Sequence, residues 1–213
     1  FCSNLQKMTK KERAKIVMTE LEKIYPEVPI PLNHKNAYEL LVAVALSAQT
    51  TDKKVNEVTP KLFSVAPNPQ KMAALEEPEI KELIKEIGLS TTKAKNLKLM
   101  ANQLLEKHNG EVPATFEDLE NLAGVGHKTA SVVMSQAFGF PAFPVDTHIH
   151  RLMKQWKLTE GKNVVQTEND AKKLFPKETW NKLHLQIIFY GREYSPARGN
   201  QERDYITKIL FEG

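Results

Sequence analysis

Apolar residues recur at helical spacing along almost the whole chain, and this periodicity constrains the fold more than any other feature of the sequence. Spacings of three and four residues place an apolar stripe on a helix, whereas a half-buried strand requires strict alternation. We find no convincing strand pattern in the 213 residues. The sequence therefore predicts an all-α protein. The stretch from Ala37 to Gln49 is apolar nearly all round, as expected of a helix buried in a domain centre.

Further helices are expected on both sides of this central segment. One begins at Thr9, which is a good N-cap, and is broken by the prolines between 26 and 31. In the helix that Thr51 or Asp52 caps, Pro60 predicts a kink or a late start. The remaining helical patterns are found near residues 80–87, 94–105, 115–121, after 146, 167–175, 180–190 and 200–211.

Composition limits the classes of function. A chain that is 41% hydrophobic and 26% charged is ordinary for a globular protein, and its length allows one large core or two modest ones. No apolar run approaches the length of a membrane span, and the N-terminus lacks a signal-peptide core. The residues before Met8 look like a leader remnant. A net charge of +4 is compatible with a polyanionic partner but does not identify one. Cys2 is the only cysteine, which excludes disulfides within the chain and sites that need several thiolates.

A glycine-rich turn leads into a helix in the middle of the chain. Gly124 and Gly126 flank Val125, and apolar residues then repeat at helical spacing from Ala130. Glycine permits a positive φ and leaves no Cβ between the backbone amides and an approaching group. Amides at the start of a helix attract anions such as phosphates. The turn is therefore expected to bind an anion, although an ordinary interhelical turn would read the same way.

Two ionisable residues follow this turn. Lys128 falls in the first turn of the helix, where the positive end of the dipole disfavours its protonated form and favours a neutral amine nucleophile. The alternative is a surface lysine that reaches a phosphate. Asp146 follows Pro144 and Val145 and precedes a helical run, so by itself it reads as an N-cap.

Together these residues resemble one family closely, the endonuclease III-type DNA glycosylases of the helix-hairpin-helix superfamily. The similarity rests on LAGVGHKTA at 122–130 and VDTHIHR at 145–151. LSAQTTD at 46–52, IGLSTTKA at 87–94 and HNGEVP at 108–113 are similar to the family as well, in the same order.

The resemblance implies a fold of two helical domains with the active site in the cleft between them. One domain is expected at 30–140, and the other is expected to combine 1–29 with 141–213, without an iron–sulfur loop. The implied enzyme is a bifunctional DNA glycosylase and AP lyase of base excision repair that removes oxidised pyrimidines. Its implied partner is damaged double-stranded DNA. We further expect a monomer that is cytoplasmic and associated with the nucleoid.

The resemblance also assigns roles to residues. Lys128 would attack the sugar C1′ and form a Schiff base, while Asp146 would stabilise the positive charge that develops on the sugar ring or shuttle protons. Gln49 and Leu89 match residues that enter the duplex where the base leaves, although a helix-end polar residue and a core leucine are the plainer interpretations. The other residues expected to contact DNA are Gly124, Val125, Gly126, His127, Thr129, His148 and Arg151.

Four departures from the family pattern stand out. Ala123 replaces the usual proline, His127 the usual arginine, and Tyr190 the usual histidine before Gly-Arg. The four cysteines of the family's C-terminal iron–sulfur loop are absent, and Ser195 begins the segment where they should stand. We therefore expect no iron–sulfur cluster and no other cofactor. Instead, a terminal helix is expected to dock on the second domain through Tyr205, Ile206, Ile209 and Leu210.

Several alternatives remain open. The chain could be a non-catalytic helix-hairpin-helix DNA-binding protein, or a glycosylase for another lesion class such as pyrimidine dimers or alkylated bases. His148 and His150 lie on different sides of a helix, so zinc is not expected, and His150 is assigned to the surface. The lysines at 93, 95 and 98 form either a solvated face or a DNA contact. The basic residues at 151, 154 and 157 could follow a phosphate backbone or simply be surface.

Overall fold

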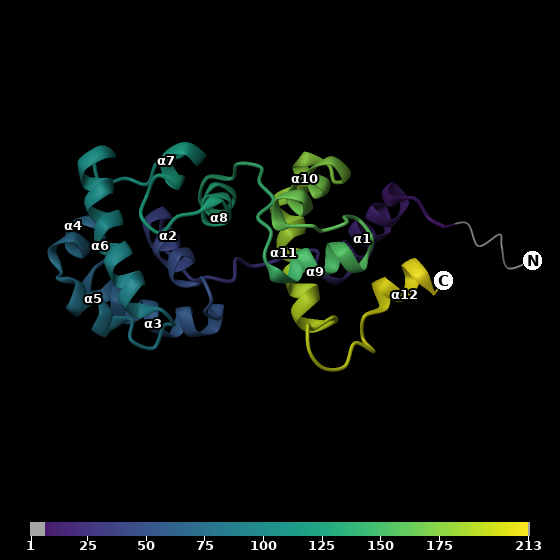
Figure 1. Cartoon of the computed structure of the whole chain (residues 1–213), viewed down its shortest axis with the longest axis horizontal. Coiled ribbons are helices and arrows are strands. Elements are labelled where there is room, and N and C mark those ends of the chain that lie inside the picture. Colours follow the sequence, from purple (N-terminus) through teal and green to yellow (C-terminus); the bar gives the residue numbers. More distant parts are fainter. Residues whose placement is uncertain (1–6, 213) are drawn as a thin grey trace, which may run out of the picture. The chain divides into compact units, whose positions relative to one another are not determined.

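The computed structural model describes residues 7–212, and helices are the only regular elements in that range, which confirms the all-α prediction. No helix in this range is both long and apolar enough to cross a membrane. The elements, labelled in Figure 1, are α1 (Lys10–Ile24), α2 (Ala37–Leu46), α3 (Asp52–Val65), α4 (Pro69–Ala74), α5 (Glu77–Leu83), α6 (Ser90–Lys107), α7 (Phe116–Glu120), α8 (His127–Phe138), α9 (Thr147–Gln155), α10 (Val164–Leu174), the 3₁₀ helix η2 (Lys177–Thr179), α11 (Trp180–Glu193) and α12 (Tyr205–Phe211).

The chain divides into two compact units. Unit 1 comprises Phe1–Pro29 and Pro141–Gly213, and unit 2 comprises Ile30–Phe140. Each unit has its own hydrophobic core, as expected when a chain of this length forms two modest cores.

Unit 2 is built around α2. Asn36 caps this helix by accepting a hydrogen bond from the backbone N–H of Glu39 at 2.9 Å. Helix α2 packs against α8, α3 and α6, while α4 and α5 pack on α6. The core side chains of α2 that are fully buried include Leu40, Leu41, Val42, Ala43 and Leu46. A helix that is apolar nearly all round is thus covered on all sides, as its sequence indicates.

Helix α3 runs through Pro60, so the predicted late start is wrong. Thr51 caps the helix before the proline by accepting from the N–H of Lys54 at 3.2 Å. Pro60 itself is exposed, and it has no N–H to donate to the carbonyl of Asn56 four residues earlier. Val55 and Leu62 lie on either side of the proline and are fully buried, and their packing holds both halves of the helix in place.

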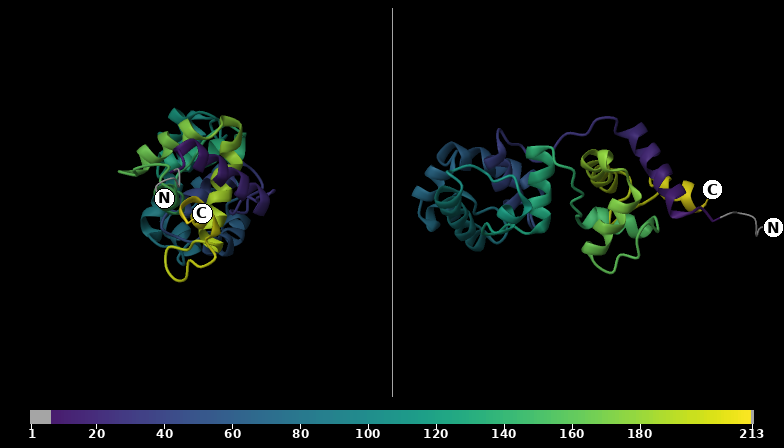
Figure 2. Two further views of the ribbon diagram at one scale, coloured as in Figure 1. Left: turned by 90° about the vertical axis from the view of Figure 1, so that its right-hand side faces the viewer. Right: turned by 90° about the horizontal axis from the view of Figure 1, so that it is seen from above.

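Unit 1 joins the two ends of the chain. Helix α11 packs on α9 and α1, and α1 also contacts α10 and α12. Both views in Figure 2 place the purple α1 and the yellow α12 side by side. The fully or almost fully buried side chains of this core include Val17, Leu21, Phe143, Ile149, Leu152, Met153, Trp156, Leu183, Ile187, Tyr190 and Ile206.

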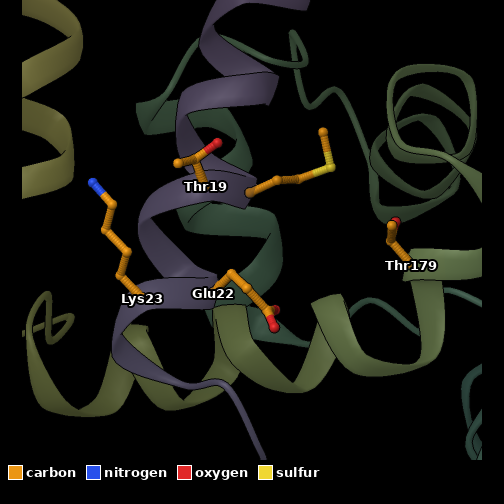
Figure 3. A pocket seen from close by; sticks show the side chains of 5 residues that line it. Thr19, Glu22, Lys23 and Thr179 are labelled. Carbon is orange, nitrogen blue, oxygen red and sulfur yellow. The ribbon is translucent and has the colours of Figure 1, made fainter.

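An open hollow lies beside α1 in unit 1. Its lining residues are Met18, Thr19, Glu22, Lys23 and Thr179 (Figure 3). The carboxylate of Glu22 accepts hydrogen bonds from Lys182 Nζ at 2.7 Å and from Gln186 Nε2 at 2.9 Å. These bonds lower the pKa of Glu22 and tie α1 to α11.

A buried carboxylate organises the C-terminal segment of unit 1. Asp204 is 3% exposed, and its Oδ1 accepts from Tyr190 Oη at 2.6 Å. Its Oδ2 accepts from Ser195 Oγ at 2.8 Å, from Gln155 Nε2 at 2.6 Å and from Thr207 Oγ1 at 2.8 Å. Burial and the bond to Asp204 raise the pKa of Tyr190, which keeps the phenol a donor. A carboxylate with this many donors can be buried at little net cost, and it joins α9, α11 and α12.

The terminal helix docks through fewer residues than its sequence suggests. Ile206 is fully buried and Leu210 is 5% exposed, whereas Ile209 is 38% exposed. The expectation that Ile209 is a docking residue is therefore wrong. Residues four apart share one face of a helix, so Ile206 and Leu210 both face the core, and the partly buried Tyr205 packs against it as predicted.

This difference gives a matched test of docking. We expect Ile206→Asp to destabilise unit 1 by about 3–5 kcal/mol, because it places an unpaired charge in the core. The melting temperature should fall by roughly 10 °C or more, measured by circular dichroism. Ile209→Asp should change it by only a degree or two, because that side chain already faces solvent. Equal losses in the two variants would contradict the observed docking face.

Candidate active site

The glycine-rich turn joins α7 to α8 as a helical hairpin. Gly124 has φ 76°, a left-handed conformation that favours glycine, and a Cβ there would lie 3.1 Å from Asn96 on α6. Gly126 differs from the expectation, because its φ of −95° is open to any residue. A Cβ at Gly126 would meet nothing within 4 Å, so the space above this residue is open. The N-cap residue of α8 is Gly126, which has no side chain to cap the helix, and amides at the start of a helix attract anions.

The departure at Ala123 has a structural role. The Ala123 N–H donates to Gln103 Oε1 at 2.7 Å, and Gln103 Nε2 donates to the carbonyl of Asn121 at 3.3 Å. One amide side chain of α6 thus holds the hairpin from both sides of Leu122. A proline at position 123 has no N–H and could not make the first of these bonds.

The structure separates the hairpin residues into exposed and buried ones. Lys128 is exposed in the first turn of α8, and Thr129 beside it is half-buried. Val125 is 7% exposed and packs in the core of unit 2, with its N–H donating to Leu122 at 3.2 Å. The side chain of Val125 therefore serves packing.

His127, the second departure from the family pattern in this motif, contacts α7, the other helix of the hairpin. Its Nδ1 donates to Glu120 Oε1 at 3.0 Å, and its ring stacks on Phe116 with the centroids 5.9 Å apart. These contacts link the first turn of α8 to α7.

Gln49 lies in a turn and not at the end of a helix. Helix α2 ends at Leu46, and the N–H of Thr50 bonds the carbonyl of Ser47 at 3.1 Å. Gln49 is exposed with φ 58°. A non-glycine residue in the left-handed region costs about 1 kcal/mol or more, and such strain is concentrated at functional sites.

Leu89 has the same two properties, so the alternative of a core leucine is wrong. Its side chain is 57% exposed and its φ is 59°. It stands at the N-cap of α6, without a side-chain cap bond. A Cβ on the preceding Gly88 would lie 3.6 Å from Thr50 Oγ1 and 3.7 Å from the carbonyl oxygen of Gln49. The turns that carry Gln49 and Leu89 therefore lie against one another, although forty residues separate them in the chain.

Unit 1 carries the aspartate. Asp146 is the N-cap of α9, and its Oδ1 accepts from the N–H of Ile149 at 2.8 Å. It is half-buried, directly after the buried Pro144 and Val145. One carboxylate oxygen thus caps the helix, which agrees with the plain N-cap interpretation. This contact does not test the catalytic role of Asp146.

His148 and Arg151 lie beside Asp146 on α9. Arg151 Nη2 donates to His148 Nδ1 at 2.9 Å. Burial lowers the pKa of His148, as do the nearby charges of Arg151 and Arg192, while Asp146 opposes the shift. His148 thus accepts at Nδ1 from Arg151, which is half-buried and orients the ring.

Gly191 lies beside His148 and has a role that cannot be derived from the sequence. It belongs to the Tyr-Gly-Arg stretch of α11, and a Cβ on it would lie 3.1 Å from both Cβ and Nδ1 of His148. The glycine lets α11 approach α9 at the histidine. A larger residue would push the His148 ring away from its bond with Arg151.

A buried histidine lies deeper in unit 1. His184 Nδ1 donates to the carbonyl of Trp180 at 3.0 Å, and its Nε2 has no hydrogen-bond partner among residues 7–212. Burial lowers the pKa of His184 to about 4, against the opposing effects of the Trp180 carbonyl and Asp146. The folded protein therefore holds this ring neutral.

The neutral His184 predicts a loss of stability in mild acid. Between pH 6.5 and pH 4 the unfolded chain binds a proton at this residue that the folded chain does not bind, so stability falls as the pH falls. The effect should be on the order of 2 kcal/mol at pH 5. Urea unfolding of the parent and of His184→Gln between pH 7 and pH 5 measures it as the growing difference between the two curves. Parallel pH profiles would contradict the assignment.

Two of the three lysines on α6 point inward, so neither a solvated face nor a DNA contact describes them. Lys93 is 7% exposed and donates to the end of α2. Lys98 Nζ donates to the carbonyls of Ala73 at 3.0 Å and Leu75 at the end of α4. Lys95 alone is exposed.

The basic residues at 151, 154 and 157 do not form a uniform stripe either. Lys157 has φ 53°, and its Nζ lies 5.1 Å from the ring centroid of Phe211. The stem of Lys154 lies against Gly161. The expected surface position of His150 is wrong, because its ring is half-buried and its Nδ1 lies 2.8 Å from Thr167 Oγ1.

The side chains present do not fit an iron–sulfur cluster. Cys2, the only cysteine, lies outside the described residues. Ser195 stands at the start of the segment where the family has its cysteines, and its hydroxyl is engaged with Asp204. Within residues 7–212 no group of three or more histidine, cysteine or acidic side chains is placed to hold a metal ion.

Comparisons with known proteins agree on one family. Residues 42–177 match the model of the HhH-GPD superfamily base excision DNA repair protein. Endonuclease III of Haemophilus influenzae is 45% identical over 205 residues, which is 96% of this chain and 97% of that protein. Endonuclease III of Escherichia coli strain K12 is 44% identical over the same shares. A solved trapped covalent intermediate of endonuclease III with DNA has 40% identity and a TM-score of 0.88, covering 91% of this chain and 92% of that one.

Proposed function

The chain belongs to the HhH-GPD superfamily of base excision DNA repair proteins, and we propose that it removes oxidised pyrimidines from duplex DNA and then nicks the abasic strand. Together with its endonuclease III relatives, it is a DNA glycosylase and AP lyase. Its substrate lesion and its mechanism are the parts that we propose.

The observation that carries the mechanism is the first turn of α8. Lys128 is exposed there, in the same turn as amides that no N-cap side chain covers, above an open space at Gly126. Such amides suit a backbone phosphate, and a phosphate bound there would bring the adjoining sugar near the lysine amine. The hairpin is braced by Gln103, so the turn needs no rearrangement to bind.

The proposed reaction uses the lysine as a nucleophile. The target nucleotide leaves the stack, and the neutral amine of Lys128 attacks C1′ as the glycosidic bond breaks and the base departs with the bonding electrons. Ring opening gives a protonated Schiff base. Loss of a C2′ proton then expels the 3′ phosphate by β-elimination, and water releases the sugar and restores the amine. Asp146 stabilises the positive charge on the sugar as the base leaves.

We propose that the enzyme works as a monomer on nucleoid DNA and holds no iron–sulfur cluster. The single cysteine and the Ser195–Asp204 bond support the second point, because such clusters are held by several thiolates. The purified protein should be colourless, and chelators should not alter its melting temperature. A brown preparation that contains stoichiometric iron would contradict this proposal.

A panel of lesion-bearing duplexes tests the function. Duplexes with an oxidised pyrimidine, a pyrimidine dimer, an alkylated base or an abasic site are incubated with the protein, with and without borohydride. We expect base release from the oxidised pyrimidine and a borohydride-trapped covalent complex with that duplex and with the abasic one. Preference for the dimer or the alkylated base would assign another lesion class. Binding without release or trapping on any duplex would mean a non-catalytic DNA-binding protein.

A further inference from the structure

Lys93 connects the two turns that carry Gln49 and Leu89. Its Nζ donates to the carbonyl of Leu46 at 2.9 Å, to the carbonyl of Ala48 at 2.6 Å and to Thr50 Oγ1 at 3.1 Å. These three acceptors surround Gln49 and begin at the last residue of α2. The side chain of one residue on α6 therefore holds the whole turn after α2.

The backbone of the same residue holds the other turn. The Lys93 N–H donates to the carbonyl of Leu89 at 2.9 Å. Gly88, which precedes Leu89, approaches Thr50 and the carbonyl of Gln49 closely enough for an added Cβ to touch both. Lys93 is thus bonded to both turns at once, by its ammonium on one side and by its amide on the other.

The charge on Lys93 suits this position and no apolar residue could replace it. Three neutral oxygens accept from the ammonium, and the carbonyl end of a helix attracts a cation. Burial lowers the pKa of Lys93, so the fold bears a cost to place a lysine here. The bonds made in return hold a turn in which Gln49 has an unfavourable left-handed backbone.

We propose that Lys93 is a positioning residue, which holds Gln49 and Leu89 side by side in their exposed, left-handed conformations before DNA arrives. The inference rests on the proposed function, and on the role that the family resemblance implies for these two side chains, which is to enter the duplex beside the flipped nucleotide. Pre-ordering them removes an entropy cost from binding that the flexible turns would otherwise bear. The benefit falls on the opening of a paired duplex, and a strand that is already unpaired gains little.

Lys98 supplies a matched control. It also lies on α6, and its ammonium also bonds carbonyls at the end of a helix, in this case α4. It touches neither Gln49 nor Leu89 through any of these bonds. Lys98→Met therefore also removes a lysine that bonds the end of a helix in unit 2. It leaves the bonds between Lys93 and the two turns in place.

The experiment compares Lys93→Met, Lys98→Met, Thr50→Val and the parent below their melting temperatures. Each is assayed for release of an oxidised pyrimidine from a paired duplex and for cleavage of a single strand with an abasic site. We expect Lys93→Met to lower the duplex-to-single-strand ratio of rates by roughly 10- to 100-fold. Lys98→Met should keep the parent's ratio. Thr50→Val, which removes one acceptor and leaves α6 intact, should lower the ratio less, and it carries the test if Lys93→Met does not fold.

A fluorescent base analogue opposite the lesion gives a second reading, because its emission rises when the duplex opens. Lys93→Met should lose most of this rise at saturating protein, as Leu89→Ala should. An unchanged ratio in both Lys93→Met and Thr50→Val, or an equal fall in Lys98→Met, would overturn the inference. These outcomes leave the proposed function intact as long as the parent acts on both substrates, whereas a parent that acts on neither would overturn the function itself.

Discussion

Lys128→Ala should abolish the borohydride trapping of this protein on abasic DNA and reduce strand nicking to background. The Schiff base requires a primary amine, and Lys128 is the exposed amine in the first turn of α8. Because the amides of that turn remain, binding of an uncleaved abasic duplex should weaken by less than about tenfold. Trapping is measured by the shift of the protein on a denaturing gel, and binding by fluorescence anisotropy.

Two further variants separate chemistry from charge. Lys128→Arg keeps the positive charge but cannot form an imine, so it should fail in trapping as completely as the alanine variant. Lys95→Ala removes another exposed lysine of the same unit and should trap like the parent. Undiminished trapping in either Lys128 variant would assign the covalent bond to a different amine.

Asp146→Asn should slow base release by two orders of magnitude or more and leave the fold intact. The asparagine oxygen can still accept from the Ile149 N–H, so α9 keeps its N-cap. What disappears is the negative charge that, in the proposed mechanism, stabilises the positive charge developing on the sugar, and one such electrostatic contact is worth roughly 10²–10³ in rate. Single-turnover release of the base from an oxidised duplex measures the loss.

The cap and the charge can be separated by a second substitution. Asp146→Ala removes both, so it should lose about 1 kcal/mol of stability in addition to activity. If Asp146→Asn releases base at the parent's rate while Asp146→Ala is merely less stable, the aspartate acts only as a helix cap.

Local signals in the sequence were enough to predict much of the fold. Thr9, Thr51 and Thr115 each accept from an N–H three residues on, as N-caps do, and the helices begin where these residues predict. The hairpin at Gly124 was predictable for the same reason, because the turn and its helix are close in the sequence. The all-α class follows from periodicity alone.

What the sequence could not show depends on neighbours distant in the chain. The Lys93 side chain points inward because its ammonium bonds the carbonyls of Leu46 and Ala48, which lie more than forty residues earlier. A lysine near the start of a helix reads as solvent-exposed unless the acceptors are known. The exposure of Leu89 is likewise hidden, because an apolar residue after an apolar run is usually core. Lys93 and Leu89 both depart from the burial that their residue types usually show. Both belong to the pair of turns that we propose opens the duplex.

The composition of unit 1 from the two outer parts of the chain has a consequence for its synthesis. Helix α1 leaves the ribosome before unit 2, whereas its packing partners α10, α11 and α12 follow it. Unit 2 is continuous in sequence and can fold as soon as it has emerged. Helix α1 can pack only after α10, α11 and α12 have been synthesised. Its sequence, KKERAKIVMTELEKI, limits aggregation while α1 is unpacked, because the charged residues leave only a narrow apolar stripe exposed. The half of the enzyme that carries Asp146 is therefore the half completed last, and activity should appear on newly made chains only after their C-terminal helices are free.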